Sequence, residues 1–281
     1  MVALTHALNK QRQRIVEQTK LASKGTANCS NASVVYVAAT LGSDSKDDRS
    51  EFLRGYQQAL PGVRILRGVN GYNHTEAIAT LLHTGVPFYN LSGGGRYWGH
   101  LANIMTHYNM LMHQVEHRIP YQVTMEDDLV VQQPYFSIYI NGACAAYERK
   151  RDSLHLLQLS QYSELIMTSL AGARYITEKM RKYGIRKNVD QQLLDHRVLG
   201  HRVGRHLNLY KFSSPTERPF RLGRRTNKGD IGKSRMLSWA EMALLRLVTD
   251  PRTRALASYG NPPNTDMCRA TKCMNSRKKL K

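Results

Sequence analysis

Cysteine is scarce in this sequence, which excludes small folds stapled by disulfides. The 281 residues contain 4 cysteines, too few and too scattered for a disulfide scaffold. Cys268 and Cys273 are close enough for a small local loop, but no second Cys or His pair with zinc spacing accompanies them. The cysteines therefore favour neither an oxidising nor a reducing compartment.

Long apolar runs are also missing. No stretch approaches the roughly 18 consecutive apolar residues that a membrane helix needs, and the first apolar run is too short for a signal peptide. We therefore expect the protein to work in the lumen of the ER or Golgi if an anchor is missing from this chain, and in the cytoplasm otherwise. Sequons at Asn28, Asn31, Asn73 and Asn90 fit a secretory route, but such short motifs also arise by chance.

The composition is nevertheless that of a folded protein. Hydrophobic residues make up 41% and charged residues 22%, which excludes wholesale disorder and collagen-like repeats. The length fits one large domain, or one domain with a tail. We divide the chain into a polar lead-in at residues 1–32, a domain at 33–250 and a basic tail at 251–281.

Acidic residues are few beside the basic ones. The chain has 21 Asp and Glu against 41 Lys and Arg, a formal net charge of +20. The excess is concentrated in residues 197–235 and in the C-terminal tail. Such segments attract polyanions: nucleic acid, an anionic membrane surface, or the diphosphate of a sugar nucleotide. We expect the tail to be solvated. Residues 197–235 include leucine and aromatic residues, so we expect them to fold over a negatively charged ligand.

The first half of the domain has the pattern of a βαβ unit. Residues 33–42 form a short run of β-branched and small residues typical of a buried strand, residues 43–60 have helical periodicity, and residues 63–69 form a second strand. This order predicts a parallel sheet, and ligands of such sheets bind beyond the carboxyl ends of the strands. We expect a mixed, mainly parallel α/β sheet flanked by helices.

Further elements follow along the chain. We predict helices at residues 98–117 and 236–248, strands at 119–125 and 154–160, and one or two helices within 169–199. The glycine-rich segment at 92–99 is not a phosphate-binding P-loop, because no Gly-Lys-Ser/Thr follows it.

Three consecutive acids are the most informative feature. Glu126, Asp127 and Asp128 follow the apolar run of a predicted strand. Adjacent carboxylates repel one another and resist burial unless a cation offsets their charge. Their oxygens suit a hard divalent ion such as Mn²⁺ or Mg²⁺, which binds substrate phosphates beside one or two protein carboxylates. The alternative is a solvated surface turn.

Four segments in order resemble glycosyltransferase family 25, the lipooligosaccharide and procollagen galactosyltransferases. They are VVYVAATLGSDSKDDR, RGVNGYN, the helix GHLANIMTHYNMLM with the following YQVTMEDDLVV, and GARYIT with NVDQQL. Three segments are also similar to the N-acetylglucosaminyltransferase IV group: YQVTMEDDLVVQQPYF, LLQLSQYSELI and VDQQLLDH. Both resemblances imply a GT-A (Rossmann-like) fold, a divalent metal, a UDP-sugar donor and inversion at the anomeric carbon. They differ in the donor sugar, galactose or N-acetylglucosamine.

The resemblances also imply roles for individual residues. Glu126 and Asp128 occupy the acidic positions of a DxD-type metal motif, in which Asp128 binds the metal and Glu126 contacts the metal, its water or the ribose. Asp127 is directed toward the sugar. Asp190, in the Val-Asp-x-x-Leu position, would be the catalytic base that deprotonates the acceptor hydroxyl. Its alternative role is that of an acid at a helix N-terminus, and Asp195 is the reserve candidate.

Other positions complete the predicted donor site. Ala39, Thr40 and Asn70 end the first two strands, where uracil and ribose would bind, and Arg49 matches the Asp-Arg of the family. Asn103 and His107 share one helix face, and His107 would touch the donor phosphate or be a structural histidine. His196, His201 and His206 include a candidate for a further metal ligand, and Arg224, Arg225 and Lys228 are candidates for a loop over the diphosphate, with a solvated loop as the alternative.

We therefore expect a metal-dependent inverting glycosyltransferase that uses a UDP-sugar and a hydroxyl acceptor on a glycan or protein. The loops at residues 73–98 and 211–235 are expected to set acceptor specificity. The rival prediction from the basic charge is a nucleic-acid-binding protein or a metal-dependent nuclease, although no usual nucleic-acid-binding module is recognisable. A non-catalytic, lectin-like relative is a third alternative.

Overall fold

The computed structural model describes residues 29–30, 33–41, 50–92, 97–150, 153–206, 218–222 and 234–252. The predicted lead-in therefore lies almost entirely outside the described residues, as does the predicted tail beyond Arg252. No helix within the described ranges is long and apolar enough to cross a membrane.

A six-stranded mixed sheet forms the centre of the molecule, in the order β2-β1-β4-β7-β6-β9. Its first three strands are β2 (Arg64–Arg67), β1 (Val34–Thr40) and β4 (Tyr121–Glu126), which run parallel. Strand β7 (Leu165–Ser169) is antiparallel to both of its neighbours. The remaining strands, β6 (Leu156–Gln158) and β9 (Val203–Arg205), again pair in parallel. The predicted mixed, mainly parallel α/β sheet is confirmed.

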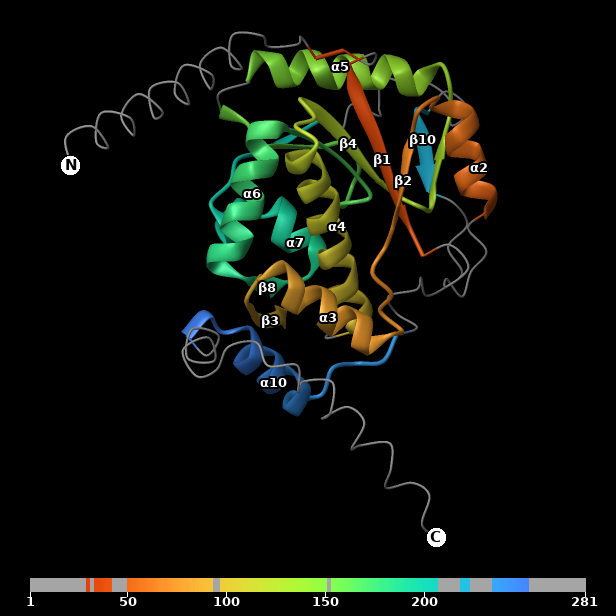
Figure 1. Cartoon of the computed structure of the whole chain (residues 1–281). Helices are drawn as coiled ribbons and strands as arrows, with labels where there is room; N and C mark the ends of the chain where they lie inside the picture. Colours follow the sequence, from red (N-terminus) through yellow and green to blue (C-terminus); the bar gives the residue numbers. More distant parts are fainter. Residues whose placement is uncertain are drawn as a thin grey trace, which may run out of the picture.

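Helices cover both sides of this sheet (Figure 1). On one side lie α4 (Trp98–Glu116), α6 (Leu170–Tyr183) and α7 (Val189–Leu194), in one apolar cluster with Ile166 of β7. On the other side α2 (Ser50–Ala59) and α5 (Tyr135–Arg149) pack in a second cluster with Val123 and Met125 of β4. Because alternate strand residues point to opposite faces, β1 contributes Tyr36 and Ala38 to this second cluster.

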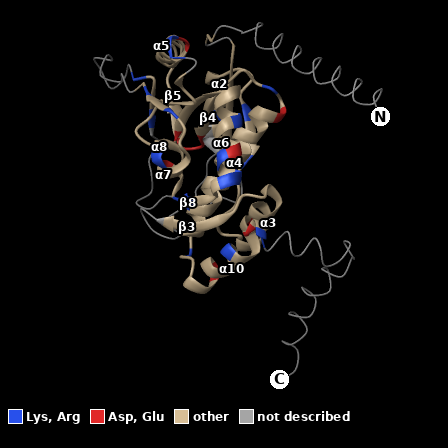
Figure 2. Ribbon diagram, turned by 90° about the vertical axis from the view of Figure 1, so that its left-hand side faces the viewer, with Lys and Arg blue, Asp and Glu red and all other residues tan. Residues whose placement is uncertain are grey.

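A smaller group of elements extends the molecule at one end. Helix α3 (His74–Thr84) and strand β3 (Phe88–Ser92) lie there, with β8 (Ile185–Lys187) paired in parallel to β3. Helix α10 (Trp239–Thr249) packs on β3 and α3, and all four lie at the opposite end from α5 (Figures 1 and 2). The expectation that residues 73–98 form a loop is therefore wrong, since they contain a capped helix and a strand.

Two short elements complete the described chain. Strand β10 (Phe220–Leu222) pairs antiparallel with β5 (Leu129–Val131), which directly follows the acidic triplet. Helix α8 (His196–Leu199) follows α7 and ends at Gly200, whose φ of 68° favours glycine.

A disulfide joins two cysteines that are far apart in the sequence. Cys29 is bonded to Cys144 on α5 across a separation of 115 residues. Nearby, Glu148 accepts hydrogen bonds from the Cys29 backbone N–H at 3.0 Å and from the Tyr121 hydroxyl at 2.7 Å. The spacing of the cysteines gave no indication of this pair, because it joins the start of the domain to a helix in its middle.

Buried polar side chains connect α4 to the sheet. Gln114 on α4 accepts a hydrogen bond from the Thr168 hydroxyl at 2.5 Å. Its amide donates to the carbonyl oxygens of Thr168 and Ile119 at 3.0 and 3.2 Å. Both side chains are buried, so water cannot replace these bonds.

Replacing Gln114 should test this connection. Gln114→Leu removes the partner of the Thr168 hydroxyl and of two carbonyl oxygens, so we expect the free energy of unfolding in urea to fall by about 1–3 kcal/mol. Gln57→Leu, on an exposed position of α2, is the matched control and should change it little. If both variants lose the same unfolding free energy, the buried hydrogen bonds of Gln114 do not stabilise the fold.

Candidate active site

The carboxyl ends of the parallel strands bring three predicted site residues to one edge of the sheet. Ala39 of β1 is in register with Glu126 of β4, and Thr40 of β1 with Arg67 of β2. Asn70 follows β2 at the same edge. The adjacency predicted from the βαβ pattern is confirmed, because parallel strands end on the same side.

The reversal of β7 brings a second loop to this edge. Because β7 is antiparallel to β4, its first residue, Leu165, lies opposite Met125. The preceding Glu164 then sits beside the triplet, where its carbonyl oxygen accepts a hydrogen bond from the Glu126 N–H at 3.0 Å. The loop at residues 159–164 therefore lines the site together with the acidic residues.

Tyr56 holds the acidic turn in place. Its hydroxyl donates to the Glu126 carbonyl oxygen at 2.7 Å and accepts from the Leu129 N–H at 2.8 Å, so that it bridges the two ends of the triplet. Burial raises the pKa of Tyr56, and the negative charges of Asp128, Asp127 and Glu126 raise it further. The tyrosine thus remains a neutral hydrogen-bond donor at physiological pH.

The Glu126 carboxylate is held from the side by helix α4. Asn103 Nδ2 donates to Glu126 Oε1 at 3.3 Å, and His107 Nε2 lies 3.2 Å from the same oxygen. Residues four apart on a helix share a face, which is why both reach one carboxylate. With Glu126 ionised, this contact assigns the His107 proton to Nε2.

His107 is almost fully buried, and its ring contacts Glu126. His107 thus contacts the Glu126 carboxylate through Nε2, and its two predicted roles, contact with the donor phosphate and a structural histidine, stay predictions. Thr106, its neighbour on α4, accepts a hydrogen bond from the Val69 N–H at 2.9 Å and so connects α4 to the end of β2.

The triplet has the chemistry of a hard-cation site with few protein ligands. Asp128 is buried, whereas Glu126 and Asp127 are partly exposed at the edge of the sheet. Among the described residues no group of three or more His, Cys, Asp or Glu is arranged to hold a metal ion. One or two carboxylates fit Mg²⁺ or Mn²⁺, because these ions take their other ligands from water and substrate phosphates.

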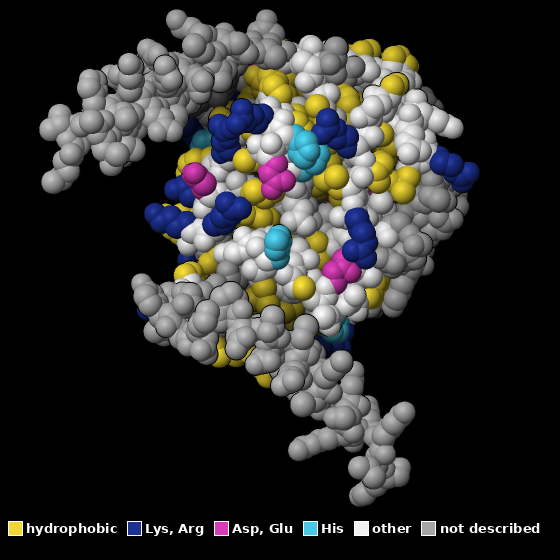
Figure 3. All heavy atoms as spheres, in the orientation of Figure 1, with side chains coloured by type: hydrophobic (Ala, Val, Ile, Leu, Met, Phe, Trp, Pro, Cys, Tyr) yellow, Lys and Arg dark blue, Asp and Glu magenta, His cyan; other side chains and the backbone are white. Residues whose placement is uncertain are grey.

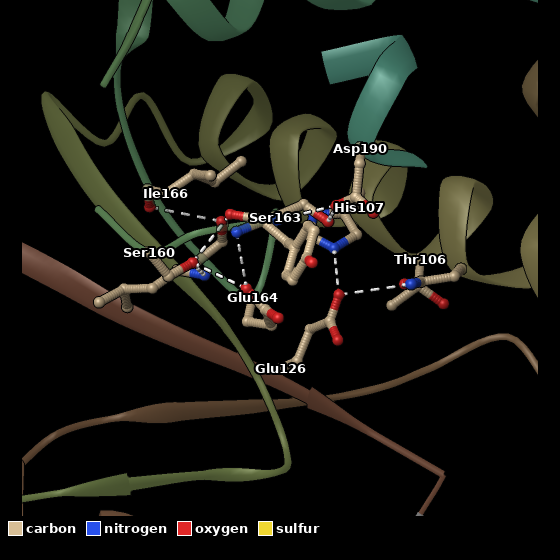
Figure 4. Close-up of polar contacts among 12 residues, drawn as sticks. Thr106, His107, Glu126, Ser160, Ser163, Glu164, Ile166 and Asp190 are labelled. Atoms are coloured by element: carbon tan, nitrogen blue, oxygen red, sulfur yellow. Dashed lines mark hydrogen bonds and ion pairs between the residues drawn. The ribbon is translucent and has the colours of Figure 1, made fainter. Parts of the chain in front are cut away.

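Asp190 is held at the same site by the loop before β7. Its Oδ1 accepts hydrogen bonds from the Ser163 N–H at 2.9 Å and from the Ser163 hydroxyl at 2.8 Å. Figure 4 shows Asp190, Ser163, His107 and Glu126 in one cluster, contributed by α7, the 159–164 loop, α4 and β4. Asp190 also lies in the first turn of α7, which fits its alternative role as an acid at a helix N-terminus.

Asp195, the reserve candidate, has a different environment. Its carboxylate caps α8 and binds the Arg197 guanidinium, with Arg197 Nη2 2.8 Å from Oδ2. The hydrogen bonds from Arg197 lower the pKa of Asp195 to about 2. A carboxyl group this acidic is a poor proton acceptor at neutral pH, so Asp190 is the better base candidate.

The turn after β2 is closely packed against the start of α4. The Asn70 side chain accepts a hydrogen bond from the Tyr72 N–H at 2.9 Å, which orders the turn. A Cβ on Gly71 would lie 2.6 Å from the Cα of Gly99, so the two backbones meet where no side chain fits. Asn70 is thereby fixed at the sheet edge, close to Ala39 and Thr40.

Three predicted histidines lie away from the described part of the site, and four basic residues cannot be placed. His201 is buried, and burial lowers its pKa; its Nε2 lies 2.5 Å from the Leu193 carbonyl oxygen. His206 packs on the Tyr139 ring, and His196 begins α8. Arg49, Arg224, Arg225 and Lys228 lie outside the described residues.

Two supporting residues were missed by the sequence analysis. Tyr56 lies on α2, 70 residues before its partner Glu126, and Ser163 lies 27 residues before Asp190. Neither has a local pattern that distinguishes it from a core tyrosine or a loop serine. Only the pairing of strands brings these residues together.

No family model matches the chain, and no curated protein matches it. A glycosyltransferase involved in glycosylating the major capsid of PBCV-1 is similar in structure, with 7% identity, a TM-score of 0.34, and coverage of 63% of this chain and 82% of that one. Mouse xyloside xylosyltransferase 1 in its apo form has 10% identity, a TM-score of 0.31, and coverage of 59% of this chain and 68% of that one. Both are glycosyltransferases, but likenesses at this level assign no function.

Tyr56→Phe should loosen the acidic turn. The substitution removes the bridging hydroxyl and leaves the buried Leu129 N–H without its acceptor, so we expect a loss of about 1–3 kcal/mol in the free energy of unfolding. Tyr183→Phe on α6 is the matched control and should have little effect. Thermal unfolding of the two variants checks this, and a Tyr56→Phe variant as stable as the control would refute the bridge.

Proposed function

We propose that this protein is a metal-dependent, inverting glycosyltransferase with a GT-A fold. It would transfer galactose or N-acetylglucosamine from a UDP-sugar to a hydroxyl group on a glycan or protein. One observation carries the proposal: the acidic triplet and Asp190 meet at the carboxyl edge of an α/β sheet, each held by buried supports. The motif resemblances to family 25 and to the N-acetylglucosaminyltransferase IV group support the same chemistry.

The donor nucleotide would bind at the ends of the first two strands. Ala39 and Thr40 are nearly buried there, and small side chains leave room for a base stacked against the sheet edge. Asn70 is fixed beside them and would contact the ribose. In this arrangement the diphosphate of the donor reaches the triplet on the neighbouring strand β4.

Asp128 and Glu126 would hold Mn²⁺ or Mg²⁺. When bound, the ion neutralises the negative charge that develops on the departing UDP. The protein's own contribution is to fix the carboxylates: Tyr56 sets the turn, and Asn103 and His107 orient the Glu126 side chain. Asp127 would contact the donor sugar.

Asp190 would act as the base of a direct displacement. The acceptor hydroxyl oxygen forms a bond to the anomeric carbon on the side opposite UDP, the bond from this carbon to the UDP oxygen breaks, and Asp190 takes the hydroxyl proton. Ser163 holds Oδ1 through two hydrogen bonds, which orients the carboxylate for proton transfer through Oδ2.

The nucleic-acid alternative gains no support from the described residues. Much of the basic region 197–235 lies outside them. Within the described part, Arg197 pairs with Asp195, and Arg235 pairs with Glu241. We therefore do not propose nuclease or nucleic-acid-binding activity.

Asp190→Asn should separate binding from transfer. The amide keeps a hydrogen-bond acceptor for Ser163 but cannot take a proton, so we expect UDP affinity to be retained and sugar transfer to fall by about 100-fold or more. Asp195→Asn is the control and should transfer normally. Mass spectrometry of products from a panel of UDP-sugars and acceptors checks this. Normal turnover by Asp190→Asn would place the base elsewhere.

Asp128→Asn should remove the metal dependence of nucleotide binding. Loss of the carboxylate charge removes the main ion ligand, so we expect UDP affinity in Mn²⁺ to fall by about tenfold or more. Glu116→Gln, at an exposed position of α4, is the control. If Asp128→Asn binds UDP in Mn²⁺ as tightly as the control does, the metal assignment is wrong.

A further inference from the structure

Helix α10 is apolar on both of its sides. Met242, Leu245 and Thr249 are buried against the rest of the molecule, where the Thr249 hydroxyl accepts a hydrogen bond from the Phe88 N–H at 2.8 Å. The opposite side is also apolar: Trp239, Leu244 and Leu247 are 71%, 56% and 59% exposed. Ala240 and Ala243 lie between them on the same exposed side.

This exposed side is unusual for a helix at a solvated surface. Surface helices have charged residues opposite their buried stripe, and a helix that is apolar all round is normally covered on all sides. Met236, immediately before α10, is 47% exposed and adds to the same apolar end of the molecule. Figure 3 shows hydrophobic side chains at the surface near its lower end, where α10 lies in Figure 1. Several large apolar side chains exposed on one side of a helix indicate a binding surface.

The sequence from α10 to the C-terminus has more basic than acidic residues. Arg246 lies at the edge of the exposed side, and Arg235 and Arg252 lie just before and just after the helix. Of the nearby acids, Glu241 is bound by Arg235 and the Asp250 side chain accepts from the Arg252 N–H. The sequence that follows, residues 253–281, adds Arg254, Arg269, Lys272, Arg277, Lys278, Lys279 and Lys281 against the single acid Asp266.

We propose that α10 is an interfacial helix that seats the protein on an anionic membrane surface. Trp239, Leu244 and Leu247 would enter the boundary between headgroups and acyl chains, and Arg246, Arg252 and the basic residues that follow in the sequence would contact anionic headgroups. Tryptophan and leucine beside basic residues are typical of helices that lie in this boundary. The proposal does not depend on the activity proposed above.

Charge favours a lipid surface over a second copy of the chain as the occupant. Two copies joined through this patch would bring the same basic residues together and repel each other. An anionic bilayer is complementary to these residues, because its negative surface potential attracts Lys and Arg. The patch and its flanking charges therefore fit the same surface.

The two tryptophans of the chain provide a direct test. Trp98 is buried and Trp239 is exposed, so a change of environment at the patch should be seen in Trp239 emission. We expect the full chain to co-sediment with vesicles containing phosphatidylserine and not with phosphatidylcholine vesicles. We also expect a blue shift of tryptophan emission on binding, which Trp239→Phe abolishes.

Matched charge substitutions separate the apolar patch from the basic residues. Leu244→Asp with Leu247→Asp should weaken vesicle binding by at least about tenfold, whereas Ile138→Asp with Ala145→Asp, at two exposed positions of α5, should leave it nearly unchanged. Both sites are exposed, and circular dichroism checks that both variants fold.

Three outcomes would overturn the proposal. The first is equal vesicle binding by the α10 double variant and by the α5 double variant. The second is binding without an emission shift, which would leave the basic tail alone responsible. The third is an emission shift that follows protein concentration in the absence of vesicles, which would make a second copy the occupant.

Discussion

The mutual repulsion of three adjacent carboxylates is the constraint around which this site is arranged. Glu126, Asp127 and Asp128 follow a strand that is buried along most of its length, so their charges stand at the border of a low-dielectric interior. Tyr56 closes the turn through the backbone at both ends, and Asn103 and His107 hold the Glu126 carboxylate from α4. These supports keep the acids together, where a cation would relieve their repulsion.

The direction of the strands determines what else reaches the triplet. Strands β1, β2 and β4 are parallel, and therefore Ala39, Asn70 and Glu126 meet at one edge. Strand β7 runs in the opposite direction, so the loop that precedes it arrives at this edge with Ser163, the residue that holds Asp190. One antiparallel strand in a mainly parallel sheet thus brings the proposed base to the proposed metal site.

Local patterns were sufficient for the elements nearest the site. The buried runs of β1 and β4 and the periodicity of α4 predicted these elements because burial dictates their apolar residues. Helix α5 was missed, although Phe136, Tyr139, Ile140 and Ala143 have helical spacing that could have revealed it. The Cys29–Cys144 disulfide and the supports Tyr56 and Ser163 depend on long-range pairing, which a single sequence does not display. Residues 73–98 were expected to be a loop, although they contain helix α3 and strand β3.

The central claim is that the triplet binds a divalent ion together with a nucleotide diphosphate. Calorimetric titration of UDP into the wild-type protein, in Mn²⁺ and then in EDTA, tests it most directly. We expect binding in Mn²⁺ that EDTA reduces by at least about tenfold, because the ion would join the phosphates to the carboxylates. Equal affinity in both conditions would contradict the metal assignment, and no binding in either would contradict the nucleotide-sugar assignment as well.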